Sequence, residues 1–375
     1  MHPNVPHLRF PEFHGEWEKC KLGDIAILTK GSGISKDQRS ATGTPCILYG
    51  ELYTTYKSEV IDYVVSKTDI SDRNLVRSCT NDIIIPSSGE TAIDISTARC
   101  VLSPGVLLGG DLNIIRLKDG DGRFFSYQLN GVRKYDIAKI AQGVSVVHLY
   151  GESIKGLTVS FPSNKEQQKI STLLSLIDER IATQSKLIEK FESLIKGIRH
   201  DLFKDIQGEV LALSNIADIY QPQTISSSDL TTEGYWVYGA NGIIGKYKEY
   251  NHETEQICIT CRGNTCGTVN YTQPKVWITG NSMVINTDKY QRQVNKRFLF
   301  HYLSSYNFKS IVSGSGQPQI VRTPLEKIKV VLPTIYKQVR IANSIDIVSE
   351  KIDTESLVLR LLENQKQYLL RQMFI

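Results

Sequence analysis

The fold is decided by a stretch that the chain contains twice: GLTVSFPSNKEQQKISTLLSLIDERIATQSKLIEKFESLIKGIRHDLF at residues 156–203, and KIKVVLPTIYKQVRIANSIDIVSEKIDTESLVLRLLENQKQYLLRQMF at residues 327–374. In each copy an apolar run typical of a β-strand ends in a proline, Pro162 or Pro333. From these prolines to the ends of both stretches, equivalent residues are 171 positions apart without a gap. A gapless match of this length indicates an internal duplication.

A long amphipathic helix is predicted after each proline. The apolar residues recur at alternating spacings of about four and three, which is the 3.5-residue period of a coiled coil. Gln184 and Glu355 interrupt the two rows at equivalent positions, and Lys366 interrupts the second row again. A polar residue in such a row can fix the register of two helices. The apolar positions are Ile170, Leu174, Ile177, Ile181, Ile188, Phe191, Ile195, Ile198 and Leu202 in the first copy, and Ile341, Ile345, Val348, Ile352, Leu359, Leu362, Leu369 and Met373 in the second.

The parts that precede the helices also match each other, but with shifting offsets. Ile83-Ile-Ile-Pro-Ser-Ser-Gly-Glu-Thr91 corresponds to Ile257-Cys-Ile-Thr-Cys-Arg-Gly-Asn-Thr265, for example. Short β-branched runs separated by Gly, Asn and Ser turns indicate sheet-rich domains. We therefore expect a mixed α/β (α+β) fold with a pseudo-two-fold internal repeat. Two similar sheet-rich domains, 1–155 and 205–326, alternate with strand-plus-helix segments, 156–204 and 327–375, whose helices form a long antiparallel two-helix coiled coil.

The composition excludes several classes of protein. The 375 residues are 41% hydrophobic and 22% charged, which is typical of a globular chain and not of a disordered one. No stretch approaches the ~20 apolar residues needed to cross a bilayer, and the N-terminus lacks the layout of a signal peptide. Seven scattered cysteines are expected in a reducing cytoplasm. The net charge of +5 permits a polyanionic partner.

Motifs of catalysis are not found in the sequence. There is no Pro-Pro pair for an adenine methyltransferase motif, no GxGxxG fingerprint, no phosphate-binding loop and no defensible Ser/His/Asp or Cys/His set. The pattern predicts a binding protein that lends specificity to other subunits, not an enzyme.

One group of residues resembles a zinc site. His252, Cys258, Cys261 and Cys266 could supply four ligands. The repeat, however, places Ile84, Ser87 and Ala92 where the three cysteines stand, so the first copy builds the same element without a metal. We therefore predict no metal site.

The helices also constrain the function. Residues 166–203 form roughly 57 Å of helix at ~1.5 Å per residue. Two similar domains on a fixed spacer, related by pseudo-two-fold symmetry, suit two sites on duplex DNA, whose helical turns repeat every 34–36 Å or so. Helices of this kind also serve as plain spacers or oligomerisation surfaces. The duplicated domains favour the DNA interpretation, because oligomerisation requires no diverged domain at each end.

Taken together, these features resemble the specificity subunit of type I restriction–modification systems, over essentially the whole chain. One departure is that Lys337-Gln338-Val339 replaces the Glu166-Gln167-Gln168 of the first copy, so an acidic residue is lost. The resemblance is carried by Leu8-Arg-Phe-Pro-Glu-Phe13, Trp17, Leu22-Gly-Asp24, Tyr238-Gly-Ala-Asn-Gly242, Ser313-Gly-Ser-Gly-Gln317 and the two strand-Pro-Gln-helix segments.

The resemblance implies that each sheet-rich domain is a target recognition domain for one half of a bipartite DNA sequence. The helix pair would set the spacer between the half-sites and dock two modification subunits. Those subunits would use S-adenosylmethionine for adenine-N6 methylation, and restriction subunits would add an ATP- and Mg²⁺-dependent nuclease. This chain would itself be non-catalytic, hold no cofactor, bind duplex DNA only weakly when alone and contact no membrane.

Candidate DNA contacts follow from side-chain chemistry in loops that the repeat makes equivalent. Arg262 is suited to guanine and Asn264 to adenine in the major groove. Glycine-rich loops allow close backbone approach, and exposed lysines can contact phosphates. The candidates are Lys30, Ser87, Ser88, Glu90, Thr91, Gln142, Ser145, His148, Tyr238, Asn241, Lys246, Lys248, Arg262, Asn264, Thr265, Gln317, Gln319 and Arg322.

Two alternatives remain at this point. One is the specificity subunit of a related system in which methylation and cleavage reside in one partner polypeptide. The other, from a different class, is a tandem scaffold whose domains bind protein. For any single candidate residue, an ordinary polar loop residue or a solvated surface charge is the simpler interpretation.

Overall fold

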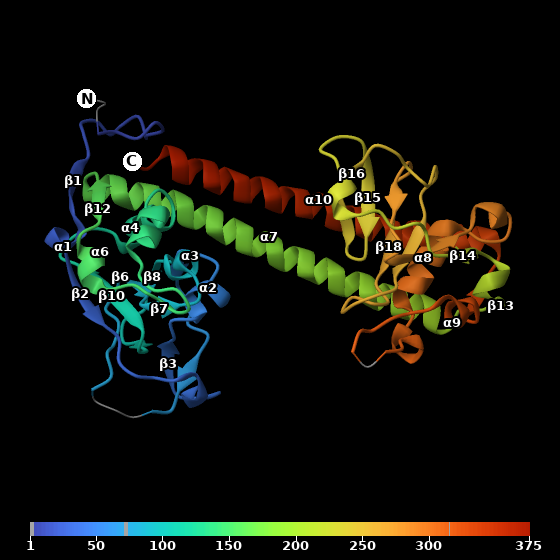
Figure 1. Cartoon of the computed structure of the whole chain (residues 1–375). Helices are drawn as coiled ribbons and strands as arrows, with labels where there is room; N and C mark the ends of the chain where they lie inside the picture. Colours follow the sequence, from blue (N-terminus) through green and yellow to red (C-terminus); the bar gives the residue numbers. More distant parts are fainter. Residues whose placement is uncertain (1–3, 71–73, 315) are drawn as a thin grey trace. The chain divides into compact units, whose positions relative to one another are not determined.

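The computed structural model describes residues 4–70, 74–314 and 316–375, and the chain divides into two compact units (Figure 1). The first unit comprises Met1–Ser185 and Leu357–Ile375, and the second comprises Lys186–Ser356. The division falls inside two long helices, α7 (Asn164–Lys204) and α10 (Ile335–Gln372). Each unit therefore contains a segment of both helices. Ser315, in the predicted glycine-rich loop, lies outside the described residues.

A five-stranded sheet with the order β2-β10-β6-β8-β4 forms the centre of the first unit. Every residue of its middle strand is buried, because helix α4 (Gly122–Asn130) packs on this strand with two aromatic side chains, Phe124 and Phe125. The sheet strands are β2 (Ala26–Lys30), β4 (Val60–Ile61), β6 (Asp82–Pro86), β8 (Arg99–Val101) and β10 (Leu112–Leu117).

Smaller elements surround this sheet. The short sheets are β1 (Glu18–Lys21) with β12 (Thr158–Phe161), β7 (Ser88–Gly89) with β11 (Val147–His148), and β5 (Lys67–Thr68), β3 (Thr44–Ile47) and β9 (Leu107–Leu108) together. The short helices are α1 (Leu22–Ile25), α2 (Glu51–Thr54), α3 (Ala92–Ile95), α5 (Lys134–Ile140) and α6 (Gly151–Lys155), with a 3-10 turn at Lys36–Gln38.

The second unit repeats this plan with fewer elements. Its main sheet has the order β14-β20-β17-β18, and a three-stranded sheet has the order β16-β15-β19. The strands are β13 (Glu209–Ala212), β14 (Asp218–Tyr220), β15 (Tyr235–Gly239), β16 (Gly242–Tyr247), β17 (Ile257–Thr260), β18 (Val269–Tyr271), β19 (Trp277–Ile278), β20 (Ser282–Asn286) and β21 (Lys329–Leu332). The helices besides α7 and α10 are α8 (Lys296–Ser305) and α9 (Arg322–Glu326), with 3-10 turns at Leu213–Asn215, Ser227–Asp229, Asp288–Tyr290 and Phe308–Ile311.

Strand pairing confirms the duplication predicted from the sequence. The strand before each long helix, β12 or β21, pairs antiparallel over four residues with the strand that opens its domain, β1 or β13. The parallel pairs β3–β9 and β15–β19 also correspond. The two copies therefore share a mixed α/β architecture and differ in loops and insertions.

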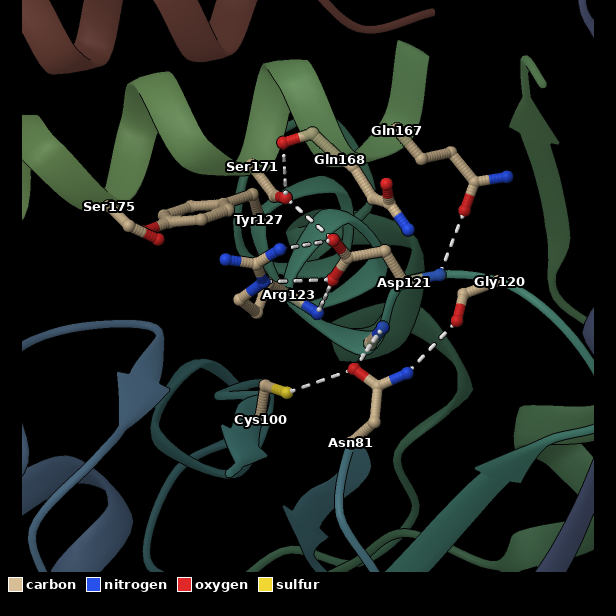
Figure 2. A network of polar contacts seen from close by, with 11 residues as sticks. Asn81, Cys100, Gly120, Asp121, Arg123, Tyr127, Gln167, Gln168, Ser171 and Ser175 are labelled. Atoms are coloured by element: carbon tan, nitrogen blue, oxygen red, sulfur yellow. Dashed lines mark hydrogen bonds and ion pairs between the residues drawn. The ribbon is translucent and has the colours of Figure 1, made fainter. Parts of the chain in front are cut away.

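The glutamine that follows each proline fastens the long helix to its domain. In the first unit the Gln167 side-chain amide donates to the Pro162 carbonyl at 2.8 Å. Its oxygen accepts the Asp121 backbone N–H at 3.0 Å (Figure 2). Gln338 forms the same two bonds in the second unit, to Pro333 at 2.9 Å and from Asn295 at 2.8 Å. Asp121 and Asn295 are the N-caps of α4 and α8. Each buried glutamine therefore joins a helix start to a strand end.

The segments of α7 and α10 run antiparallel in each unit. In the first unit Asp178 of α7 meets Lys366 of α10, and in the second Ile195 packs in the same cluster as Ile341 and Ile345. The ends of the two predicted apolar rows are buried in the domain cores, and the residues towards the middle are half-buried. Among the described helices, none combines the length and the apolar character that a bilayer crossing requires.

A buried ion network holds the end of α10 in the first unit. The Lys366 ammonium pairs with the Glu59 carboxylate and, at 2.6 Å, with that of Asp178, which also accepts the Tyr127 hydroxyl at 2.8 Å. Burial raises the pKa of Glu59. Burial alone would lower the pKa of Lys366, but the two carboxylates outweigh it and raise this pKa. Lys366, one of the two polar residues that interrupt the second apolar row, is thus a buried cation paired with carboxylates.

Candidate nucleic-acid interface

Two loops of the second unit that carry predicted site residues lie against each other. Arg262 and Gln319 form an antiparallel bridge, and the Gly263 N–H donates to the Pro318 carbonyl at 3.0 Å. Ser313 and Gln319 exchange two backbone hydrogen bonds of 2.8 Å. Residues 261–265, 313–314 and 316–322 are therefore one structural element, and we call them the paired loops of the second unit.

The first unit builds the same element from residues 87–91 and 142–148, the paired loops of the first unit. Ser88 of β7 is the register partner of His148 of β11. Gln142 and His148 exchange backbone hydrogen bonds of 2.9 and 2.7 Å, as Ser313 and Gln319 do in the second unit. The loops that we predicted separately thus come together in both copies.

The backbone beneath the paired loops is equivalent too. The Ser87 N–H donates to the Asp111 carbonyl at 2.7 Å, and the Ser87 carbonyl accepts the Leu149 N–H at 2.9 Å. In the second unit Cys261 forms both bonds at 3.0 Å, with Asn281 and Ile320. Because the scaffold is shared, differences between the two loop pairs reside in their exposed side chains.

Those side chains differ in charge. In the first unit Glu90 is exposed, and Thr91 caps α3 by accepting the Asp94 N–H at 3.1 Å. In the second unit Asn264 is exposed at the position of Glu90, and Arg262 is exposed at the position of the half-buried Ser88. The remaining predicted residues of these loops, Gln142, Ser145, His148, Thr265, Gln317, Gln319 and Arg322, are also exposed.

The β15–β16 turn adds a third loop to the element in the second unit. The Thr265 hydroxyl donates to the Asn241 side-chain oxygen, so that this turn lies beside residues 261–265. Lys246 stacks over the Trp236 ring at 4.8 Å. Lys248 is exposed and lies 3.7 Å from the Glu249 carboxylate.

Several predicted residues lie elsewhere. Ser87 and Tyr238 are 8% exposed, and the Tyr238 hydroxyl accepts the Gln273 N–H at 3.4 Å. We therefore assign these two a packing role beneath the surface. Lys30 is exposed at the end of β2, where it is the register partner of Asn113.

A pocket of about 390 Å³ opens at the paired loops of the second unit. Arg262, Gln319 and Arg322 contribute to its lining, and the Arg322 guanidinium is held by Glu326 at 2.7 Å. Hydrogen-bond donors around a small hollow of this kind are suited to base edges or phosphates.

A larger pocket in the first unit was missed in the sequence. It measures about 900 Å³ and is lined by residues that include Lys36, Arg39, Glu51 and Asp111. The Arg39 guanidinium lies 3.6 Å from the buried Glu51 carboxylate. Asp111 connects this pocket to the paired loops through its bond with Ser87. The sequence feature that could have indicated this pocket is the pair of cations, Lys36 and Arg39, after Gly31 and Gly33. By itself, such a pair resembles any charged surface loop.

The zinc-like residues of the sequence occupy separate environments. Cys258 and Cys261 pack in different hydrophobic clusters. The His252 imidazole hydrogen-bonds the Tyr220 hydroxyl at 2.8 Å, and burial lowers the pKa of His252 to about 4. In the described part of the chain, no group of three or more His, Cys, Asp or Glu side chains is arranged to hold a metal.

The family model described as the type I restriction modification DNA specificity domain matches residues 14–193 and 207–364. These two matches cover both units and most of both long helices.

Curated relatives carry related names. The chain is 28% identical over 155 residues to the EcoprrI specificity subunit of Escherichia coli, an alignment that covers 40% of this chain and 37% of that protein. It is 25% identical over 396 residues to the putative MjaX specificity subunit of Methanocaldococcus jannaschii, covering 93% and 91%. The chain thus spans little more than a third of the first relative and most of the second.

Solved structures share the fold. The type I restriction–modification S subunit of M. genitalium superposes with a TM-score of 0.68 at 20% identity, over 99% of both chains. A chain from a structure of type I complex assembly gives 0.57 at 14% identity, over 98% of this chain and 99% of that one.

Proposed function

The chain belongs to the type I restriction–modification DNA specificity family, and from that premise we propose that each of its two sheet-rich domains reads one half of a bipartite duplex DNA target. DNA specificity is the function that the family description names. Domains 1–155 and 205–326 would be the target recognition domains. Segments 156–204 and 327–375 would set the spacing between the half-sites.

The observation that carries the proposal is the repeated pairing of loops. A shared backbone element presents Ser88, Glu90 and His148 in one unit, and Arg262, Asn264 and Gln319 in the other. Base edges in the major groove are read by exposed side chains of this kind, with Arg directed to guanine and Asn to adenine. One scaffold with two sets of exposed polar groups suits a target whose halves differ in sequence.

Phosphate contacts would come from cations around these loops. Lys30 in the first unit and Lys248 in the second are exposed, and Lys246 in the second unit is half-exposed. Lys36 and Arg39 at the 900 Å³ pocket would add positive charge to the unit whose paired loops carry Glu90. Phosphate contacts fix register and orientation without carrying sequence information.

The long helices would dock two modification subunits, whose S-adenosylmethionine would supply the methyl group for adenine-N6. Restriction subunits using ATP and Mg²⁺ would join that complex. The chain itself would be non-catalytic, would work in the cytoplasm and would bind DNA tightly only within the assembly. Exposed apolar side chains on the first unit's helix segments, Leu176, Leu357 and Leu361, support this docking role.

The proposal is tested by mapping N6-methyladenine across the host genome with the wild-type gene, without it, and with Arg262→Ala. We expect a bipartite motif that is lost with the gene. With Arg262→Ala, we expect one half of the motif to relax while the other half stays. An unchanged map, with the partner methyltransferase expressed, would contradict DNA specificity and favour a protein-binding scaffold.

A further inference from the structure

An N-terminal arm covers the start of α7 in the first unit. Residues 4–15 form this arm, which begins its contact with α10 where the Leu8 N–H donates to the Gln372 carbonyl at 2.9 Å. The Arg9 guanidinium then makes two hydrogen bonds of 2.8 Å to the Glu166 carboxylate, which is 1% exposed. Bidentate pairs of this kind are both strong and geometrically specific.

A second ion pair follows along the same arm, and here the arm supplies the carboxylate and α7 supplies the cation. Glu12 of the arm pairs with Lys169 of α7. The Lys169 ammonium lies 4.6 Å from the centre of the Phe10 ring, and Phe10 packs against the hydrophobic core of the first unit. The arm thus supplies one cation, one anion and an aromatic side chain to the surface formed by the start of α7 and the end of α10.

The second unit has the equivalent groove without an arm. A hollow of about 440 Å³ lies between the start of α10 and the end of α7, and Leu202 and Ile341 form its apolar floor. Lys337, Arg340 and Tyr336 line its rim. The constant separation of 171 residues makes Lys337 the counterpart of Glu166, and Arg340 the counterpart of Lys169.

The two grooves differ in charge and exposure. Lys337 replaces the carboxylate that anchors Arg9, so the rim of the second groove carries two cations. Among the described residues no carboxylate forms an ion pair with either of them, and Arg340 stacks only over Tyr336, at 5.9 Å. Ile335, Tyr336 and Val339 are 41%, 70% and 37% exposed, where α7 has Asn164, Lys165 and Gln168.

We propose that this second groove, at Leu202, Tyr336, Lys337, Arg340 and Ile341, binds a short acidic segment of a modification subunit that also carries a large apolar side chain. The proposal rests on the docking role inferred above for the long helices. In the first unit the equivalent helix ends hold an irregular segment of the chain that turns between Phe10 and Phe13, and the charge reversal at Lys337 selects a different peptide. An arm like the chain's own would bring Arg9 against Lys337, so that neither this arm nor that of a second copy fits.

A peptide is favoured over DNA as the occupant by the apolar floor and by the exposed isoleucine, tyrosine and valine. Phosphate groups would satisfy the two cations but would leave this apolar surface in water. An acidic segment with one apolar side chain satisfies both features, as the arm does in the first unit. Apolar anchors surrounded by complementary charge are typical of protein interfaces.

The test uses the full-length chain with the modification subunit of the same host. The double variant Lys337→Glu/Arg340→Glu is compared with wild type and with Lys165→Glu, a matched charge reversal on the exposed first turn of α7. We expect the double variant to bind one of the two modification subunits about tenfold or more weakly, while Lys165→Glu binds both as wild type does. Binding is followed by titration calorimetry and by the mass of the assembly in solution.

Two further measurements decide between explanations. A modification subunit whose acidic segment is changed to a basic one should restore binding to the double variant. A folding defect in the double variant would not allow this restoration. Unchanged binding of both subunits by the double variant would overturn the proposal, as would a loss of DNA retention alone, which would assign the groove to nucleic acid. If the wild-type chain bound no modification subunit, the broader docking role would fail together with this inference.

Discussion

The paired loops of the two units have the same backbone and opposite character. In the first unit they present serine, histidine and Glu90, and in the second they present Arg262, Asn264 and Gln319. The hydrogen bonds that the two loop pairs have in common join backbone atoms. The comparison shows that the exposed side chains of a duplicated element can diverge while its backbone hydrogen bonds are kept.

The ends of the long helices differ in a second way. Lys366 of α10 is paired with two carboxylates in the first unit, whereas its equivalent Ile195 of α7 packs in the apolar core of the second. Equivalent helix positions therefore hold a buried ion network in the first unit and a buried apolar side chain in the second. Each helix end fits its own domain and would be a poor fit to the other.

The largest expected effect on stability comes from removing the buried cation of the first unit. Lys366→Met would leave Glu59 and Asp178 buried without their cation, and we expect it to cost about 3–5 kcal/mol of stability in the first unit. Ile195→Met, the matched change in the second unit, should cost less than about 1.5 kcal/mol. Hydrogen exchange of amides in α4 and α8 would report on each unit. Equal losses in the two variants would refute the special role of the ion network.

The ion network also predicts a dependence on alkaline pH. The pKa of Lys366 is raised above its ordinary value of 10.5, so its contribution is fully present below that pH and is lost as the pH rises through the folded-state pKa. The first unit should therefore lose exchange protection at high pH, and Lys366→Met should abolish that loss.

Acid should act on the other unit. Burial lowers the pKa of both His252 and His301 to about 4, and both lie in the second unit. The unfolded chain takes up these protons near pH 6.5, so the contribution is complete above that pH and declines as the pH falls towards 4. We expect amides of α8 to lose protection in this range before those of α4. The described histidines of the first unit, His7, His14 and His148, are exposed.

Arg262→Ala sharpens the comparison of the loops. We expect loss of about 1–3 kcal/mol of discrimination at one base pair of the second half-site, because the bidentate contact to guanine that we propose for Arg262 would be removed. Ser88→Ala, at the equivalent position of the first unit, should change discrimination less, because a hydroxyl makes a single contact. Retention of the assembled complex on DNA with substituted bases measures both. An equal effect of the two changes would contradict the assigned difference.

The smallest effect is expected for Glu90→Gln. Removing a negative charge from the first unit's loops should raise binding to unrelated DNA by a few tenths of a kcal/mol, about twofold or less, because repulsion from phosphates falls. Glu18→Gln, on strand β1, serves as a control with the same loss of charge. The difference should vanish at high salt, and its persistence there would exclude an electrostatic cause.

Much of the fold followed from comparing the sequence with itself. The strand-Pro-Gln-helix segment predicted α7 to within two residues of its start, and Gln167 and Gln338 share two side-chain hydrogen bonds, to which Gln338 adds a third, to the Gln293 carbonyl. The equivalence of residues 87–91 and 261–265 was also correct in the backbone. The burial of Tyr238, the ion pairing of Lys366 and the 900 Å³ pocket were not foreseen, because each depends on residues remote in the chain.

The sequence by itself determined the duplication, the mixed architecture, the long helices and the family, because hydrophobic period, turn chemistry and internal matching are local properties of the chain. Only the tertiary structure decided which loops meet and which groove is covered. Arg262 and Gln319 become neighbours because the strand order places their loops together, and the second groove lies open because an arm exists only before the first domain. Contacts of this kind join residues that are remote in the chain, and the spacing of residues in the sequence carries no information about them.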